Sequence, residues 1–279
     1  MNHPQGLARR PSAVLAALKM DPNRRELYVE GSTDVAFVRF VAADARDPNA
    51  LIHAIADVDI SATEDGEKGR LIAFAMAVDP ETRVLCFADA DHDRLHGVTH
   101  TANVVLTDMT DMEAYVLNEA CLSKALLLGV QTTRHDAKAI LDQVIAAARQ
   151  IGILRYVQRS HWRSLPVNAV TPASAVVVRD GQLLFDFPRF VSSVVARHGK
   201  DPSLGQVIER IAEATEKLSG IADADIVRGK DAMALLAEYL KDLGVCRNDS
   251  PKLVRMGFDV TRMTLHSNLA RVVDFVSVA

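Results

Sequence analysis

Carboxylates follow three segments of this chain that are typical of buried strands, in each case at the point where the apolar run ends. Since the carboxyl ends of parallel strands meet at one edge of an open α/β sheet, we expect these side chains to converge there. Hard divalent cations such as Mg²⁺ bind oxygen ligands of this kind. In chain order the carboxylates are Glu30 and Asp34, Asp89 and Asp91, and Asp108, Asp111 and Glu113.

The chemistry that such a cluster supports is metal-dependent cleavage of phosphodiester bonds. Two ions about 4 Å apart activate a water molecule and stabilise the leaving oxygen. We expect Glu30, Asp89 and Asp91 to be catalytic and to bind Mg²⁺ or Mn²⁺, with Glu30 also acting as a base or bridging two ions. Asp34 is a further expected ligand.

The other carboxylates have weaker assignments. Asp108 and Glu113 are expected to complete the ligands of one ion or to orient the residues that do. For Asp34, Asp111 and Glu113, stabilisation of a following helix N-terminus is an equally good interpretation.

Two of these motifs resemble the Toprim family, which includes topoisomerases, primases and nucleases of the overcoming-lysogenization-defect type. Its members carry a glutamate after the first strand, often as Glu-Gly-x-x-Asp, and an Asp-x-Asp pair after a later strand; residues 30–34 and 89–91 match both. Residues 107–113 and 151–155 resemble one bacterial branch, whose members are nuclease effectors beside a partner ATPase in antiviral defence. The resemblance covers roughly the first 120 residues. It implies a nuclease acting on DNA or RNA under the control of a partner.

Basic residues suggest where phosphate would bind. Lys68 and Lys230 are the expected substrate contacts, although neither belongs to a phosphate loop, because no Ser or Thr follows a Gly-Lys pair. A second basic stretch, residues 155–163, contains Trp162. It is typical either of a surface that clamps a nucleic-acid strand or, slightly more often, of a solvated helix end.

The pattern of apolar residues predicts the elements that position these groups. Strands alternate with helices in the first part, which predicts an α/β fold with a mostly parallel sheet and helices on both faces. The second part has mainly helical periodicity and one β-hairpin near residues 175–186, with Asp180 and Gly181 at the turn. We therefore expect a catalytic domain over residues 1–120 and a mainly helical domain over 121–279. The expected strands are 26–29, 51–56, 83–88 and 103–107, and the expected helices are 11–19, 32–43, 67–78, 136–153, 188–197, 204–218 and 231–243.

Composition is that of an ordinary globular protein. The 279 residues are 49% hydrophobic and 24% charged, with a formal net charge of -4, which neither supports nor excludes a nucleic-acid partner. Cys86, Cys121 and Cys246 form no Cys-x-x-Cys pair, and we expect buried thiols in a reducing cytoplasm. No apolar run approaches the length of a membrane span, so we expect no membrane partner and leave homo-oligomerisation open.

Two other functions remain open at this point. In a haloacid-dehalogenase-like phosphatase, Asp89 would be the nucleophile and Asp91 the acid, but that motif normally lies on the first strand with Thr or Val at the position of Asp93. A non-catalytic Toprim-like module would bind nucleic acid or a protein. The presence of Glu30, Asp34, Asp89 and Asp91 favours catalysis over that third possibility.

Overall fold

The computed structural model describes residues 8–43, 46–61, 66–79, 81–130, 136–199, 202–259 and 265–277. The chain forms two compact units. Unit 1 comprises Met1–Asp108 and Val260–Ala279, and unit 2 comprises Met109–Asp259. The expected boundary at residues 120 and 121 falls inside unit 2, and the last helix of the chain belongs to unit 1.

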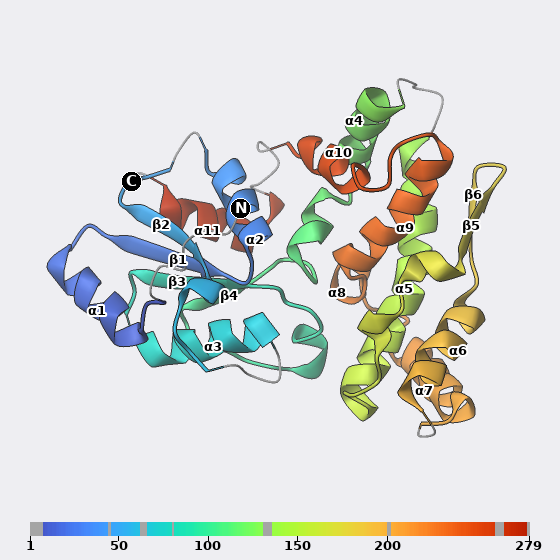
Figure 1. Cartoon of the computed structure of the whole chain (residues 1–279), viewed down its shortest axis with the longest axis horizontal. Coiled ribbons are helices and arrows are strands. Elements are labelled where there is room, and N and C mark those ends of the chain that lie inside the picture. Colours follow the sequence, from blue (N-terminus) through green and yellow to red (C-terminus); the bar gives the residue numbers. More distant parts are fainter. Residues whose placement is uncertain are drawn as a thin grey trace. The chain divides into compact units, whose positions relative to one another are not determined.

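Unit 1 is built on a four-stranded parallel sheet in the order β2-β1-β3-β4 (Figure 1). Its register places Val29 beside both Ala54 and Phe87, so β1 and β3 end at the same edge. The predicted α/β class and parallel sheet are confirmed. The strands are β1 (Arg25–Val29), β2 (Ala50–Ala54), β3 (Val84–Ala88) and β4 (Val104–Leu106).

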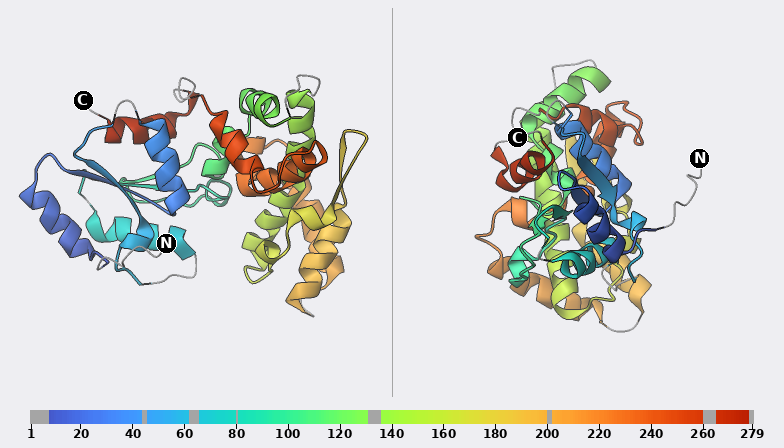
Figure 2. Two further views of the ribbon diagram at one scale, coloured as in Figure 1. Left: turned by 45° about the horizontal axis from the view of Figure 1, so that its top comes forward. Right: turned by 90° about the vertical axis from the view of Figure 1, so that its left-hand side faces the viewer.

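Helices cover both faces of this sheet (Figures 1 and 2). One face carries α1 (Pro11–Met20) and α3 (Gly66–Val78), and the other carries α2 (Ser32–Val41) and α11 (Ser267–Val276). The helix α11 contacts all four strands, although the sequence pattern did not predict it.

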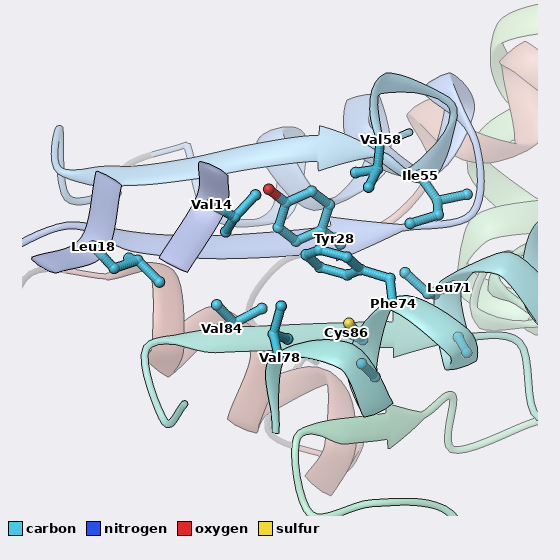
Figure 3. Packing of buried hydrophobic residues seen from close by; sticks show 12 residues of the cluster. Val14, Leu18, Tyr28, Ile55, Val58, Leu71, Phe74, Val78, Val84 and Cys86 are labelled. Atoms are coloured by element: carbon cyan, nitrogen blue, oxygen red, sulfur yellow. The ribbon is translucent and has the colours of Figure 1, made fainter. Parts of the chain in front are cut away.

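The core under α1 and α3 follows from the period of two along the strands. Tyr28 and Cys86 point to this face and pack with Leu18, Phe74 and other buried apolar residues (Figure 3). Burial raises the pKa of the Cys86 thiol. Cys86 and Cys121 are buried as expected, but Cys246 is exposed, so the prediction of three buried thiols is wrong for that residue.

Unit 2 is mainly helical and packs around the long helix α5 (Ala137–His161), which contacts α4, α7 and α9. The helix continues beyond its predicted end at residue 153 because apolar residues up to Val157 remain buried. The predicted hairpin is present as β5 (Val176–Arg179) and β6 (Gln182–Phe185), with positive φ at Asp180 and Gly181. The other helices are α4 (Glu119–Gly129), α6 (Phe187–His198), α7 (Leu204–Lys217), α8 (Asp223–Ile226), α9 (Gly229–Asp242) and α10 (Ser250–Met256).

Short 3-10 helices occur in the connections of both units. None of the described helices is long and apolar enough to cross a membrane. The 3-10 helices are η1 (Ile55–Asp57), η2 (Arg94–His96), η3 (Met112–Val116), η4 (Val167–Ala169) and η5 (Pro172–Ala175).

A buried glutamate at the start of β1 ties the N-terminal segment to the sheet. The Glu26 side chain is 0% exposed and accepts hydrogen bonds from Arg9 at 3.0 Å, Arg24 at 2.6 Å and the Tyr28 hydroxyl. Burial by itself raises the pKa of Glu26, but the hydrogen bonds from Arg9, Tyr28 and Arg24 outweigh it and hold the pKa below its usual value. The carboxylate is therefore a structural anion.

We expect the Glu26→Gln variant to lower the free energy of unfolding by about 2–3 kcal/mol at pH 7, because it removes the charge partner of two arginines. A lowered folded-state pKa contributes stability that is present above the usual pKa of glutamate and is lost as pH falls through the folded value. Urea unfolding should therefore show the two proteins converging below about pH 4.

Glu67→Gln is the matched control for this measurement. Glu67 is 48% exposed and pairs with Arg70 three residues along the same helix. Such an exposed pair contributes less than about 0.5 kcal/mol. An equal effect of the two substitutions would contradict the structural role of Glu26.

Candidate active site at the carboxyl edge of the sheet

Glu30 and Asp89 meet at the carboxyl edge of the sheet in unit 1. Each directly follows a strand, Glu30 after β1 and Asp89 after β3, and these strands are paired in parallel. The Asp89 backbone N–H donates to Glu30 Oε1 at 2.9 Å. Asp89 is 5% exposed and Glu30 is partly buried. The sequence therefore predicted correctly that these two residues lie together.

The loop after β3 brings Asp91 to the same edge by a route that the sequence did not reveal. The strand β3 ends at Ala88, so Asp91 lies in the loop that follows it. Asp91 has a φ of 47°, in the left-handed region that Asp tolerates better than most residues. The Ala90 N–H donates to the Thr107 hydroxyl at 2.9 Å, which ties the loop to the end of β4.

Lys68 reaches into this loop from the first turn of α3. Its ammonium lies 3.0 Å from Asp91 Oδ2, 3.0 Å from Asp93 Oδ2 and 3.2 Å from the carbonyl oxygen of Ala90. His100 Nε2 lies 2.8 Å from the same oxygen of Asp93. Asp93 and His100 were not among the expected site residues. The available signal was that Asp93 continues the alternation of aspartates at 89 and 91.

Two of the histidines at positions 92, 96 and 100 have little exposure to solvent. His92 is only 5% exposed. His100 is 9% exposed and is held by Asp93. At least these two imidazoles are packed into the structure of the loop.

The pKa of the Glu30 carboxyl is raised above its usual value. Burial raises the pKa of Glu30 to about 8, and the neighbouring carboxylates of Asp89 and Asp91 act in the same direction. The hydrogen bond from the Asp89 N–H and the charge of Lys68 oppose this shift without cancelling it. A cation bound at this edge would favour the ionised form of Glu30.

The donors at this edge fit a hydrated Mg²⁺ or Mn²⁺. Within the described residues, no group of three or more His, Cys, Asp or Glu side chains is arranged to hold a metal by itself. Mg²⁺ usually keeps several waters and is bound in proteins by one or two carboxylates. Glu30 and Asp89 supply carboxylates at the ends of paired strands, which meets that requirement.

Asp34 and Asp108 have contacts that stabilise helix ends. Asp34 Oδ2 accepts from the Gly31 N–H at 2.8 Å at the start of α2. Asp108 accepts from the backbone N–H groups of Asn268 at 2.9 Å and Leu269 at 3.0 Å at the start of α11. Gly31 itself has an extended backbone, with φ -132° and ψ 170°. Metal binding by Asp34 and Asp108 stays a prediction.

Asp111, Glu113 and Lys230 lie in unit 2, whereas Glu30 and Asp89 lie in unit 1. Asp111 is 0% exposed and accepts from the N–H groups of Ala114 at 3.0 Å, Gly229 at 2.9 Å and Lys230 at 3.1 Å. Glu113 accepts from Arg255 at 3.0 Å, and the Lys230 ammonium lies 3.8 Å from Glu113. These contacts join η3 to α9 and α10.

Part of the basic stretch at residues 155–163, at the end of α5, forms contacts within unit 2. Arg155 donates to both oxygens of Asp231, at 2.5 and 2.8 Å, and its side chain is 11% exposed. Arg163 is exposed and forms no hydrogen bond or ion pair with any described residue. The rings of His161 and Trp162 lie 5.6 Å apart at the helix end.

Comparison of the sequence with models of known protein families and with curated proteins finds no match.

We expect Gly229→Ala to destabilise the protein by roughly 3 kcal/mol in urea unfolding. A Cβ at this position would lie 2.2 Å from Asp111 Oδ1 and 2.3 Å from the Ala114 nitrogen. The matched control is Gly205→Ala in α7, where a Cβ meets nothing within 4 Å, and there we expect no loss. Equal stability of the two variants would rule out the tight contact around Asp111.

We expect the metal-free protein to lose stability as pH rises from about 5 to 8, because the folded state retains the Glu30 proton while the unfolded state releases it. Glu30→Gln removes this dependence, so its stability relative to wild type should increase over that range by an amount on the order of a few kcal/mol. Urea unfolding in EDTA measures this difference. Parallel pH profiles for the two proteins would contradict the raised pKa.

Proposed function

We propose that unit 1 is the catalytic part of a metal-dependent nuclease that hydrolyses phosphodiester bonds of DNA or RNA. The observation that carries the proposal is the meeting of Glu30 and Asp89 at the carboxyl edge of a parallel sheet, joined by a 2.9 Å hydrogen bond. Ligands of open α/β sheets bind at this edge. The motifs at residues 30–34 and 89–91, which resemble those of the Toprim family, support the same activity.

The chain's own residues have defined parts in this proposal. A bound Mg²⁺ or Mn²⁺ lowers the pKa of a coordinated water and stabilises charge on the leaving oxygen. Glu30 and Asp89 would hold the ion. Glu30, which the bound cation would keep ionised, would also accept a proton from the attacking water as the general base. Asp91 would orient the loop through Lys68, to which it is hydrogen bonded at 3.0 Å.

The proposal includes nucleic acid as substrate and control by a partner ATPase. In phosphodiester cleavage, a polyanionic substrate would have to approach the carboxylates at this edge of the sheet. Bound divalent cations would offset the repulsion between these negative charges. The ATPase follows from the resemblance to effectors of antiviral defence. It also agrees with the need to restrain a nuclease inside the cell that makes it.

The first test is cleavage of single-stranded DNA, double-stranded DNA and RNA by the purified chain with Mg²⁺ or Mn²⁺, alone and with ATPases that co-purify with it. We expect Glu30→Gln and Asp89→Asn to reduce the rate at least about 10²-fold, because metal stabilisation of the transition state contributes several kcal/mol. EDTA should abolish cleavage.

Asp142→Asn serves as the charge-matched control. Asp142 is 63% exposed on α5 of unit 2 and pairs with Lys138 across one helical turn. Its activity should equal that of wild type. Cleavage that survives both Glu30→Gln and Asp89→Asn would overturn the assignment of the site, and a stable phosphoryl group on Asp89 would indicate a phosphatase instead.

A further inference from the structure

Lys68 places a positive charge inside the group of carboxylates at the sheet edge. Its ammonium is surrounded by oxygens of Asp91, Asp93 and Ala90 at 3.0, 3.0 and 3.2 Å. The side chain is only 11% exposed and extends from the first turn of α3. The ammonium therefore occupies a position among oxygen atoms where a second metal ion would otherwise be expected.

Two hydrogen bonds and an ion pair hold this ammonium. Of its three N–H donors, one donates to Asp91 Oδ2 at 3.0 Å and one to the Ala90 carbonyl at 3.2 Å, and Asp93 Oδ2 lies 3.0 Å away. Contact with a substrate phosphate, the role expected from the sequence, would compete with these contacts. The arrangement favours a cation that organises the loop.

The carboxylates at this edge therefore have two different environments. Asp91 and Asp93 share the Lys68 charge at 3.0 Å, and Asp93 is also held by His100 at 2.8 Å. Among the described residues, in contrast, no hydrogen bond or ion pair joins Lys68 to Glu30, whose carboxylate accepts from the Asp89 N–H at 2.9 Å. A metal ion is therefore expected beside Glu30 and not between Asp91 and Asp93.

We propose that the Lys68 ammonium takes the place of a second divalent cation, so that the edge holds one ion, bound by Glu30 and Asp89. This inference rests on the proposed function, since it assumes that a metal binds at this edge, and it replaces the expectation of two ions. A tethered ammonium has a high effective concentration at its site. A second ion would have to displace it from two carboxylates.

The number of Mn²⁺ ions bound by the whole chain tests the proposal without any assay of cleavage. Electron paramagnetic resonance of free Mn²⁺ and titration calorimetry should both give one ion per chain for wild type. Lys68→Met removes the charge while keeping a similar length, and it should bind two ions. Lys68→Arg retains the charge and should still bind one.

The possible results separate the inference from the proposed function. Two ions in wild type, or one ion in both wild type and Lys68→Met, would overturn the role of Lys68 while leaving a metal site at this edge. No bound ion in wild type would overturn both. One ion in wild type that persists in Glu30→Gln with unchanged affinity would place the metal elsewhere. The wild-type number decides against two ions even where Lys68→Met fails to fold, and Lys68→Gln then provides a second neutral variant.

Discussion

The hydrogen bond from the Asp89 backbone to the Glu30 carboxylate is the interaction on which the candidate site depends. It forms because β1 and β3 are neighbours in a parallel sheet and end in register, with Val29 beside Phe87. A change of register by one residue would turn the side chains of a strand to the opposite face. The buried cores on both faces of the sheet therefore maintain the geometry of two carboxylates that lie beyond it.

The two glutamates of the β1 region show how environment decides the role of a side chain. Glu26 and Glu30 lie near opposite ends of the same strand, and burial raises the pKa of each. Around Glu26, two arginines and a tyrosine outweigh that effect, and the carboxylate anchors the N-terminal segment. Around Glu30 the carboxylates of Asp89 and Asp91 act in the same direction as burial, and the pKa of Glu30 stays raised to about 8.

Much of the fold could be predicted because its signals are local. Apolar runs identify all four strands, and Asp180-Gly181 identifies the hairpin turn. The proximity of Glu30 and Asp89 could be predicted because each residue directly follows a predicted strand. The left-handed turn at Asp91 and the reach of Lys68 into the loop could not be predicted, because both depend on contacts between segments distant in sequence.

The roles of several carboxylates could not be decided from the sequence, and the reason is physical. Asp34 and Asp111 lie at helix starts, where an aspartate is equally suited to accept backbone N–H groups and to bind metal. Asp108 accepts backbone N–H groups at the start of α11, which is remote in sequence. Asp108 and Asp111 are only three residues apart, but they belong to different compact units. No local pattern marks that division, because it arises from the return of the chain to the sheet at α11.

That return has a consequence for the order in which the protein forms during synthesis. Unit 2 is inserted in the chain between β4 and α11. The helix α11 contacts all four strands of the sheet, and backbone N–H groups in its first turn donate to the Asp108 carboxylate. The ribosome releases segments in chain order, at about 5–20 residues per second. The part of the sheet face that α11 covers, beside α2, therefore stays uncovered until the whole of unit 2 has been made. A nascent chain therefore carries Glu30 and Asp89 early, but the layer of helices behind their strands is complete only after unit 2 and α11 have been made.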